Sequence, residues 1–227
     1  MDDTMKKIAA VYTGAALLAP LSSLLHDMLP DYRIINLLDD SLIGEVARAG
    51  GATLAVRRRL LAYYQALSED GADLILNTCS SIGEVVYEAR PFIPVPIVRI
   101  DDAMTREAVS RYRRIGVVAT LSTTLEPTAN LVYRWAKRLD RTPVVVTGLA
   151  EGAFASLNAG DTGGHDQGIL ETARGIAGDC DVILLAQASM ARMEEQLAGA
   201  LGKPVFSSPR RAIEMVRSIL AGETGED

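Results

Sequence analysis

Short apolar runs and longer segments with helical spacing alternate along the whole chain. Runs that predict strands lie at 7–13, 32–38, 74–76, 94–100, 114–120, 142–147, 181–185 and 204–207. Helical spacing predicts helices at 15–28, 42–49, 52–68, 81–90, 101–112, 123–140 and 190–201, with a helix-rich stretch up to 178 that is interrupted at 160–164 and a last helix from 209. Strands that alternate with helices are typical of right-handed βαβ units and parallel sheets, so the pattern predicts an α/β fold. The prolines at 94 and 96 favour an edge position for the strand that contains them.

The segment from Leu74 to Glu84 combines a strand, a thiol and the start of a helix. Leu74–Leu76 is continuously apolar, which is typical of a strand covered on both faces. Ser81 precedes Glu84 by three residues, which is the spacing of a capping box, so we predict Ser81 as a helix N-cap. Cys79 then lies just before a helix N-terminus, where free N–H groups and the helix dipole are expected to lower the pKa of a thiol. The alternative is a cysteine that only fills space in the core.

The two halves of the chain match each other at three places in register. The matching segments are 7–13 with 114–120, 73–79 with 181–187, and 96–98 with 204–206. Thr13 and Cys79 are 66 residues apart, and their counterparts Thr120 and Gln187 are 67 residues apart. The repeat predicts two pseudo-symmetric lobes, each a parallel sheet flanked by helices.

The repeat also predicts where a ligand binds. Ligands of open α/β sheets lie beyond the carboxyl ends of the strands. Thr13 and Cys79 would then line one wall of an active-site cleft between the lobes, and Thr120 and Gln187 would line the other. We expect residues 1–100 and 207–227 to form the lobe that carries Cys79, and residues 101–206 to form the lobe that carries Gln187.

The composition is that of an acidic globular protein. The 227 residues are 48% hydrophobic and 23% charged, with a net charge of −6. This length is sufficient for one large core or two small ones, and the negative charge indicates neither a nucleic-acid nor a membrane-surface partner. No apolar run approaches the roughly 20 residues of a membrane span, and the first residues lead into a strand rather than a secretory leader. With only Cys79 and Cys180, a reducing, cytoplasmic location is expected.

Four short motifs, in this order, resemble those of a known superfamily. They are VYTG at 11–14, LNTCSS at 76–81, VVATLSTT at 117–124 and LLAQAS at 184–189. Over nearly its whole length the chain resembles the aspartate/glutamate/hydantoin racemase superfamily, which includes arylmalonate decarboxylases and maleate isomerases. The resemblance implies a two-lobed α/β enzyme, often a homodimer, that works without pyridoxal phosphate or another cofactor and without a metal. In the racemases, one cysteine from each lobe flanks the substrate's Cα, so that one removes a proton and the other returns one on the opposite face.

Carried over by position, Cys79 matches the first of these cysteines and Gln187 takes the place of the second. A glutamine amide neither accepts nor delivers a proton near neutral pH, so two-base racemisation lacks one of its bases. Ser80 and Ser81 also replace the family's Asn-Thr, so an amino-acid substrate is not assured. Cys180 does not take over the role, because seven residues at about 3.3 Å each place it near the other end of its strand from Gln187. The same argument speaks against a disulfide between Cys79 and Cys180.

Cys79 could act as a general base, as an acid when protonated, or as a nucleophile towards a small carboxylate. Hydroxyl and N–H groups at the strand–helix junctions could bind carboxylates and stabilise developing negative charge. The candidate hydroxyls are those of Thr13, Ser80, Ser81, Thr120, Thr123 and Ser189. Ser81 and Thr123 could instead be helix caps only, and Thr13 could simply end a strand. Gln187 could donate to a carboxylate or enolate oxygen, or serve as a structural amide.

Other chemical signatures are weak. His26 and His165 lie in polar segments and are expected to be exposed, so neither a histidine metal site nor a Ser-His-Asp triad is predicted. No GxGxxG follows a strand and no Walker sequence occurs, so nucleotide binding has no support.

The sequence therefore predicts a cofactor-independent isomerase of racemase type that uses Cys79 for proton transfer at a carbon next to a carboxylate. Its expected partner is a small carboxylate or amino-acid-like substrate. The first alternative is a one-thiol lyase, because decarboxylation with reprotonation on one face needs only one acid. The second is a carboxylate-binding sensor without chemistry.

Overall fold

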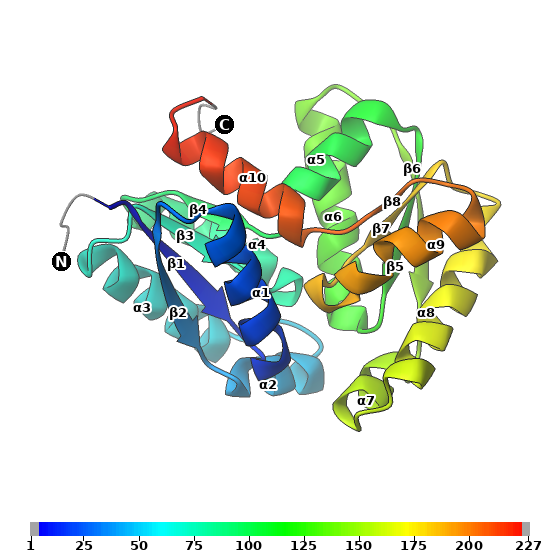
Figure 1. The fold of residues 1–227 in the computed structure, drawn as a ribbon, viewed down its shortest axis with the longest axis horizontal. Helices are drawn as coiled ribbons and strands as arrows, with labels where there is room; N and C mark the ends of the chain where they lie inside the picture. Colours follow the sequence, from blue (N-terminus) through cyan, green and yellow to red (C-terminus); the bar gives the residue numbers. More distant parts are fainter. Residues whose placement is uncertain (1–4, 224–227) are drawn as a thin grey trace. The chain divides into compact units, whose positions relative to one another are not determined.

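The computed structural model describes residues 5–223, and its contacts divide the chain into two compact units. Unit 1 comprises Met1–Ile100 and Pro209–Asp227, and unit 2 comprises Asp101–Ser208. Each unit is built on a four-stranded parallel sheet flanked by helices (Figure 1). The predicted two-lobed α/β fold is thereby confirmed, whereas the cleft between the lobes stays a prediction.

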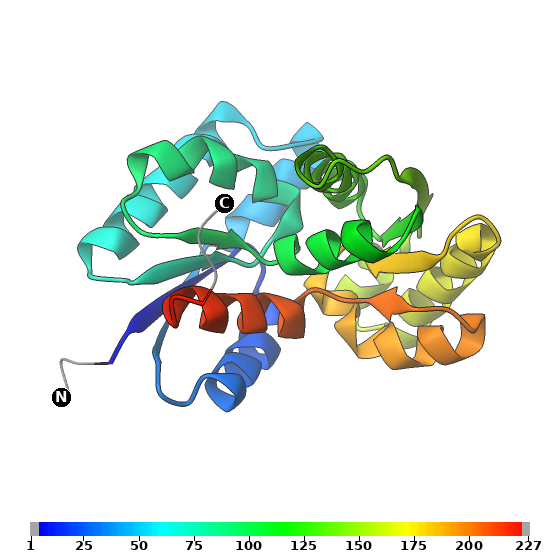
Figure 2. The same cartoon turned by 90° about the horizontal axis from the view of Figure 1, so that it is seen from above.

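Unit 1 has its strands in the order β2-β1-β3-β4, and all pairs are parallel. The strands are β1 (Lys7–Tyr12), β2 (Arg33–Leu38), β3 (Leu74–Asn77) and β4 (Ile97–Arg99). The helices are α1 (Ala15–Met28), α2 (Ser41–Ala49), α3 (Leu54–Glu69), α4 (Gly83–Ala89) and α10 (Pro209–Leu220), with the 3₁₀ helices η1 (Ser80–Ile82) and η2 (Arg90–Phe92). Helices α1 and α10 lie on one side of the sheet, and α3 and α4 lie on the other (Figure 2). β4 is an edge strand, as the prolines before it predict.

The central strand β3 is covered on both faces, as its continuous apolar run predicts. All four of its residues are buried, and Ile75 packs in one cluster with Leu60 of α3 and Val86 of α4. Asn77 ends the strand and is also fully buried. Because a buried amide is costly unless it is hydrogen-bonded, the partners of Asn77 matter for the site described below.

Unit 2 repeats this arrangement with the strand order β6-β5-β7-β8. Its strands are β5 (Arg114–Ala119), β6 (Val144–Leu149), β7 (Val182–Leu185) and β8 (Val205–Phe206). Its helices are α5 (Asp102–Arg111), α6 (Ser122–Arg138), α7 (Ala153–Asn158), α8 (Thr162–Ala177) and α9 (Glu194–Leu201), with the 3₁₀ helix η3 (Ala188–Met193). Ile169 of α8 and Leu197 of α9 pack with Ile183 of β7 in one core cluster.

The sequence repeat corresponds to the same hydrogen bonds in both units. The Lys7 N–H donates to Asp73 Oδ2 over 2.6 Å, and the Arg114 N–H donates to Asp181 Oδ2 over 3.0 Å. Each aspartate thus ties the start of a first strand to the segment before the third. The first and third strands therefore have the same relative register in both units, so the residues that follow them at the carboxyl edge are also equivalent.

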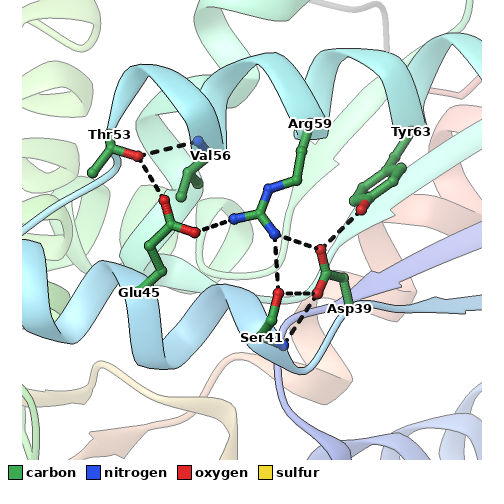
Figure 3. A network of polar contacts seen from close by, with 7 residues as sticks. All are labelled: Asp39, Ser41, Glu45, Thr53, Val56, Arg59 and Tyr63. Carbon is green, nitrogen blue, oxygen red and sulfur yellow. Dashed lines mark hydrogen bonds and ion pairs between the residues drawn. The ribbon is translucent and has the colours of Figure 1, made fainter.

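A network of side chains links α2 to α3 near the carboxyl end of β2 (Figure 3). Arg59 donates to Asp39 Oδ2 over 3.3 Å and forms an ion pair with Glu45. The Tyr63 hydroxyl donates to the same oxygen of Asp39 over 2.8 Å. Thr53 caps α3 by accepting from a backbone N–H. These ion pairs of Arg59 fix the helix α3, which also carries the next tyrosine, Tyr64.

Two predicted helix N-caps, Ser81 and Thr123, need correction. Ser81 is not an N-cap, because the chain tightens into η1 directly after Cys79 and Ser81 lies inside this turn. Thr123 is not an N-cap either, since α6 begins at Ser122 with Leu121 as the capping residue. A capping-box spacing cannot distinguish a cap from its neighbour when the chain first forms a tighter turn. The strand predicted at 142–147 begins two residues later, at Val144.

Candidate functional site

The carboxyl edge of the unit 1 sheet holds Thr13 and Cys79 together. Thr13 directly follows β1, and Cys79 follows β3 by two residues. Thr78 fixes this turn, because its N–H and its Oγ1 both donate to the Val11 carbonyl, over 3.1 and 2.9 Å. Cys79 has extended dihedral angles (φ −121°, ψ 115°) and precedes η1, which turns the following N–H groups back towards its side chain.

Several donors surround the Cys79 thiol. They are the Thr13 hydroxyl, the Ser81 hydroxyl and the backbone N–H groups of Ser81 and Ile82. Burial is nevertheless the larger influence, and it raises the pKa of the Cys79 thiol above its ordinary value although each of these donors lowers it. The expectation of a lowered pKa is therefore wrong. The structure does contain the N–H groups on which that expectation depended, but they act in a poorly solvated place.

Ser80, the residue after Cys79, has an unsatisfied hydroxyl. The residue is 5% exposed, and its Oγ has no hydrogen-bond partner among the described residues. Buried hydroxyls are normally paired, so an unpaired one next to a thiol indicates a place where a ligand or a water completes the bonding. Of the predicted residues of this edge, the structure joins Thr13 and Ser81 to Cys79 by hydrogen bonds and places Ser80 next to it in the chain.

Arg99 is a charged residue of this edge that sequence reasoning missed. It ends β4, is paired in register with Asn77 and is only 1% exposed. Its guanidinium occupies the space where a side chain at position 83 would lie, because a Cβ on Gly83 would come within 2.5 Å of Arg99 Cζ. It also lies 5.5 Å from the centre of the Tyr87 ring. The available signal was an arginine within the apolar run from Ile97 to Ile100, where a charge is unexpected.

The carboxyl edge of unit 2 has Gln187 in the position that Cys79 has in unit 1. Gln187 follows β7 by two residues and precedes η3, with φ −118° and ψ 136°. Its Oε1 accepts from the Thr120 N–H over 2.6 Å and from the Thr120 hydroxyl over 3.0 Å. A backbone N–H can only donate, so the atom that it contacts must be the amide oxygen, and the NH₂ group must point the other way. Within its own unit, Thr120 therefore does for Gln187 what Thr13 does for Cys79.

The other two candidates of this edge lie on the elements that follow. Thr123 is in the first turn of α6, is 7% exposed and has an Oγ1 without a partner among the described residues. Ser189 is half-buried in η3, two residues after Gln187. No hydrogen bond joins either of them to the Thr120–Gln187 pair in the described part of the chain. Their role in binding stays a prediction.

Two residues away from the carboxyl edges, Cys180 and His165, were also assigned from the sequence, and only the prediction for Cys180 agrees with the structure. Cys180 lies just before β7, at the opposite end from Gln187, and its thiol donates to the Ile176 carbonyl over 3.1 Å. Both cysteines are free, as predicted.

His165 is fully buried, which corrects the expected exposure. Its Nδ1 lies 2.8 Å from Asp166 Oδ1, so a polar neighbour covers a side chain that the sequence placed in solvent.

The described residues, 5–223, contain no group of three or more His, Cys, Asp or Glu side chains that could hold a metal ion. In the same part of the chain, no helix has both the length and the apolar character to cross a membrane.

The two edges differ in the chemistry that they offer. A thiol can release and take up a proton, and the donors around Cys79 can stabilise negative charge near it. The amide of Gln187 offers a donor fixed in orientation but no exchangeable acid or base. Among the described residues, the unit 1 edge therefore provides a thiol, several hydrogen-bond donors and the unpaired hydroxyl of Ser80, and the unit 2 edge provides an amide donor and the unpaired hydroxyl of Thr123.

Solved structures with similar folds include racemases. They include glutamate racemase from Francisella tularensis subsp. tularensis SCHU S4 in complex with D-glutamate (17% identity, 96% of this chain and 81% of that chain covered, TM-score 0.75). Allantoin racemase from Klebsiella pneumoniae (19%, 98% and 90%, TM-score 0.71) and aspartate racemase from Picrophilus torridus (14%, 97% and 96%, TM-score 0.72) are also similar. At these identities the likeness shows the fold alone.

The sequence itself carries the assignment to a family. No curated protein matches the chain. A family description, Asp/Glu/Hydantoin racemase, matches residues 10–216 and thus includes both carboxyl edges described above. This chain therefore belongs to the Asp/Glu/Hydantoin racemase family, which supports an isomerase with racemase-type activity.

Proposed function

We propose that this protein is a cofactor-independent isomerase that moves a proton at a carbon next to a carboxylate, with the Cys79 thiol as its acid–base group. The observation that carries the proposal is the surrounding of Cys79 Sγ, where the Thr13 hydroxyl and the N–H groups of Ser81 and Ile82 converge. The unpaired, buried hydroxyl of Ser80 next to it supports a ligand at this place.

The proposed step needs both forms of the thiol. The thiolate removes the proton from the carbon, and the electron pair of the broken C–H bond moves towards the carboxylate to give an enolate. The enolate must then turn over in the site before the same thiol returns a proton to the opposite face of the carbon, because return to the first face only regenerates the substrate. Because burial raises the pKa of Cys79, less thiolate is present near neutral pH, but the thiolate that forms is a stronger base. Donors at the edge stabilise the enolate's charge, which is the main barrier to such a step.

Gln187 has a supporting role in this proposal. Its amide oxygen is engaged by Thr120, so its NH₂ group is the part available to a carboxylate or enolate oxygen. The expectation that both carboxyl edges contact one substrate stays a prediction, and the Gln187 variant in the Discussion tests it. Thr123 and Ser189 are proposed as further hydroxyls for the substrate's oxygens. A homodimer is proposed from the family resemblance alone.

A one-thiol lyase is the second candidate function, and two observations favour it. The thiol is held in its protonated form by burial, and position 187 has no second base. In this reaction the C–C bond to one carboxylate breaks, CO₂ leaves, and the electron pair stays on carbon as the enolate of a second carboxyl group on the same carbon. The Cys79 thiol protonates the carbon, and the thiolate regains a proton from water.

Incubation with small carboxylic and amino acids in D₂O distinguishes these reactions. An isomerase incorporates deuterium at the carbon next to the carboxylate, while the substrate loses no mass as CO₂. A lyase incorporates deuterium with loss of CO₂. In both cases Cys79→Ser should abolish the exchange, because a serine hydroxyl is too weak an acid to replace the thiol. Binding of a carboxylate without deuterium incorporation would reject both the isomerase and the lyase and favour a carboxylate-binding sensor.

A further inference from the structure

A polar chain of two fully buried side chains leads from helix α3 to the backbone of Cys79. The Tyr64 hydroxyl donates to Asn77 Oδ1 over 3.1 Å. The Asn77 Nδ2 group donates to the Cys79 carbonyl over 3.0 Å. Tyr64 and Asn77 are both 0% exposed. The chain therefore connects the core side of α3 with the turn that carries the thiol.

The direction of these hydrogen bonds is fixed by their chemistry. The Cys79 carbonyl can only accept, so the amide nitrogen of Asn77 must face it. The amide oxygen then faces Tyr64, whose hydroxyl must donate. A rotation of the Asn77 amide would bring its oxygen against the Cys79 carbonyl and so lose that bond, although the Tyr64 hydroxyl could then accept from the amide nitrogen. The Cys79 carbonyl is thereby held in one orientation relative to β3.

We propose that Tyr64 and Asn77 are positioning residues that hold the Cys79 turn so that the Thr13 hydroxyl and the N–H groups of Ser81 and Ile82 stay directed at the thiol. This inference deepens the proposed function and rests on it where it assigns the acting group to Cys79. Neither residue touches the thiol's sulfur through these bonds, so both act through the backbone of the turn.

The location of the pair distinguishes this role from simple packing. An apolar pair of similar size would fill the same space without the cost of burying an amide and a hydroxyl. In unit 1, the neighbouring residues of β3 are apolar, and Asn77 alone places an amide at the strand's end. In unit 2 the equivalent position is Leu185, in the lobe that has Gln187 in place of a thiol. The polar pair thus occurs in the unit that has the thiol.

Burial and two nearby ionisable groups, Cys79 and Arg99, shift the pKa of the Tyr64 hydroxyl, which donates the first hydrogen bond of this polar chain. Burial raises the pKa of Tyr64 far above its ordinary value, the nearby Cys79 raises it further, and Arg99 lowers it. The net effect is a raised pKa, so the Tyr64 hydroxyl keeps its proton, and its role as a donor, beyond the pH at which an ordinary tyrosine ionises.

The test measures the thiol itself and needs no substrate. The rate of alkylation of Cys79 by iodoacetamide is followed against pH on the intact protein, by mass spectrometry of the peptide that contains it. Tyr64→Phe should loosen the turn and so weaken the donors to the Cys79 thiolate. The midpoint of the pH profile should then move upwards by about one unit, which corresponds to the loss of about one hydrogen bond to the thiolate.

Tyr63→Phe is the matched control. Tyr63 is the preceding residue on α3, and its hydroxyl also makes one hydrogen bond, to Asp39 at the end of β2 (Figure 3). Its removal should leave the midpoint unchanged. If Tyr64→Phe is too unstable to measure, Tyr64→Phe combined with Asn77→Leu removes both partners at similar volume, which is commonly tolerated, and should raise the midpoint as well.

Each outcome bears on the inference. A midpoint that stays at the wild-type pH in Tyr64→Phe or in the double variant, or one that falls, overturns it. An upward shift together with the absence of deuterium exchange in the wild type would retain the positioning role and reject the proposed enzyme. Exchange in the wild type without any shift in the variants would do the reverse.

Discussion

Thr120 engages the amide oxygen of Gln187 with both its N–H and its hydroxyl, over 2.6 and 3.0 Å. The same type of residue, Thr13, donates to the thiol of Cys79 at the corresponding place in the other unit. A threonine after the first strand is thus common to both units, while the group that it contacts differs. In the proposed function, the edge with Cys79 therefore supplies the acid–base group and the edge with Gln187 supplies a donor.

Gln187→Glu tests the proposed donor. A carboxylate keeps an oxygen for Thr120 but loses the N–H donor and adds a negative charge that repels a substrate carboxylate. Turnover should fall by about 10²–10³-fold, as for the loss of one donor to an oxyanion. The measurement is the rate of deuterium incorporation, with the thermal midpoint as a check of folding. Gln196→Glu, at an exposed position of α9, is the control. Equal rates in wild type and Gln187→Glu would remove Gln187 from the proposed site.

Gly83→Ala tests the close approach of Arg99 to the start of α4. The new Cβ would lie 2.5 Å from Arg99 Cζ, and the guanidinium is too deeply buried to move freely. We expect a loss of about 1–3 kcal/mol in the free energy of unfolding, the usual cost of overpacking. Gly175→Ala in α8 meets no atom within 4 Å and should be neutral or stabilising. Urea unfolding followed by far-ultraviolet circular dichroism measures both. If the two variants prove equally stable, the packing described for Arg99 is incorrect.

Cys79 should be alkylated by iodoacetamide before Cys180. Burial raises the pKa of both thiols, so ionisation does not explain a preference. Cys79 is half-buried, whereas Cys180 is fully buried and donates to the Ile176 carbonyl. The native protein should therefore gain a single adduct at Cys79, and the second adduct should appear only after unfolding. Peptide mass spectrometry distinguishes the sites. Modification of Cys180 first would contradict the burial of the two thiols.

The stability of the protein should fall at alkaline pH because of Cys79. Its folded-state pKa is raised above the unfolded value of about 8.5, so its contribution is complete below that pH. The contribution is lost as the pH rises through the folded pKa, by at most about 1.4 kcal/mol per pH unit. Cys79→Ser lacks this ionisation and should lose less stability between neutral and alkaline pH, while Cys180 is common to both proteins. Urea titrations at several pH values measure the difference, and parallel pH profiles would refute it.

Much of the fold follows from local sequence. Alternating apolar and helical segments predict the strands to within about three residues and the parallel connections between them, because period and length are local properties. The repeat predicts that Cys79 and Gln187 take equivalent places, and both lie two residues after their strand and directly before a 3₁₀ turn. These features depend on chain order alone.

The chemical state of the site depends on packing between distant segments. The sequence predicts a helix start near Cys79. It does not predict the direction of the pKa shift of the Cys79 thiol, because burial depends on everything that packs around the thiol. The partners of Asn77 are 13 residues away on α3 and at the turn itself, so no local pattern reveals them. The polar neighbours of His165 predict exposure, but the residue is fully buried, because burial depends on the distant segments that pack around it.

The sequence by itself determined the order of strands and helices, the duplication of the α/β unit, and the exchange of a thiol for an amide at position 187. Only the tertiary structure decided which atom of Gln187 faces Thr120, how Arg99 fits against Gly83, and that Tyr64 reaches the Cys79 turn through Asn77. The physical reason is that secondary structure follows from interactions along a few residues, whereas hydrogen-bond direction and desolvation depend on groups that only the folded chain brings together.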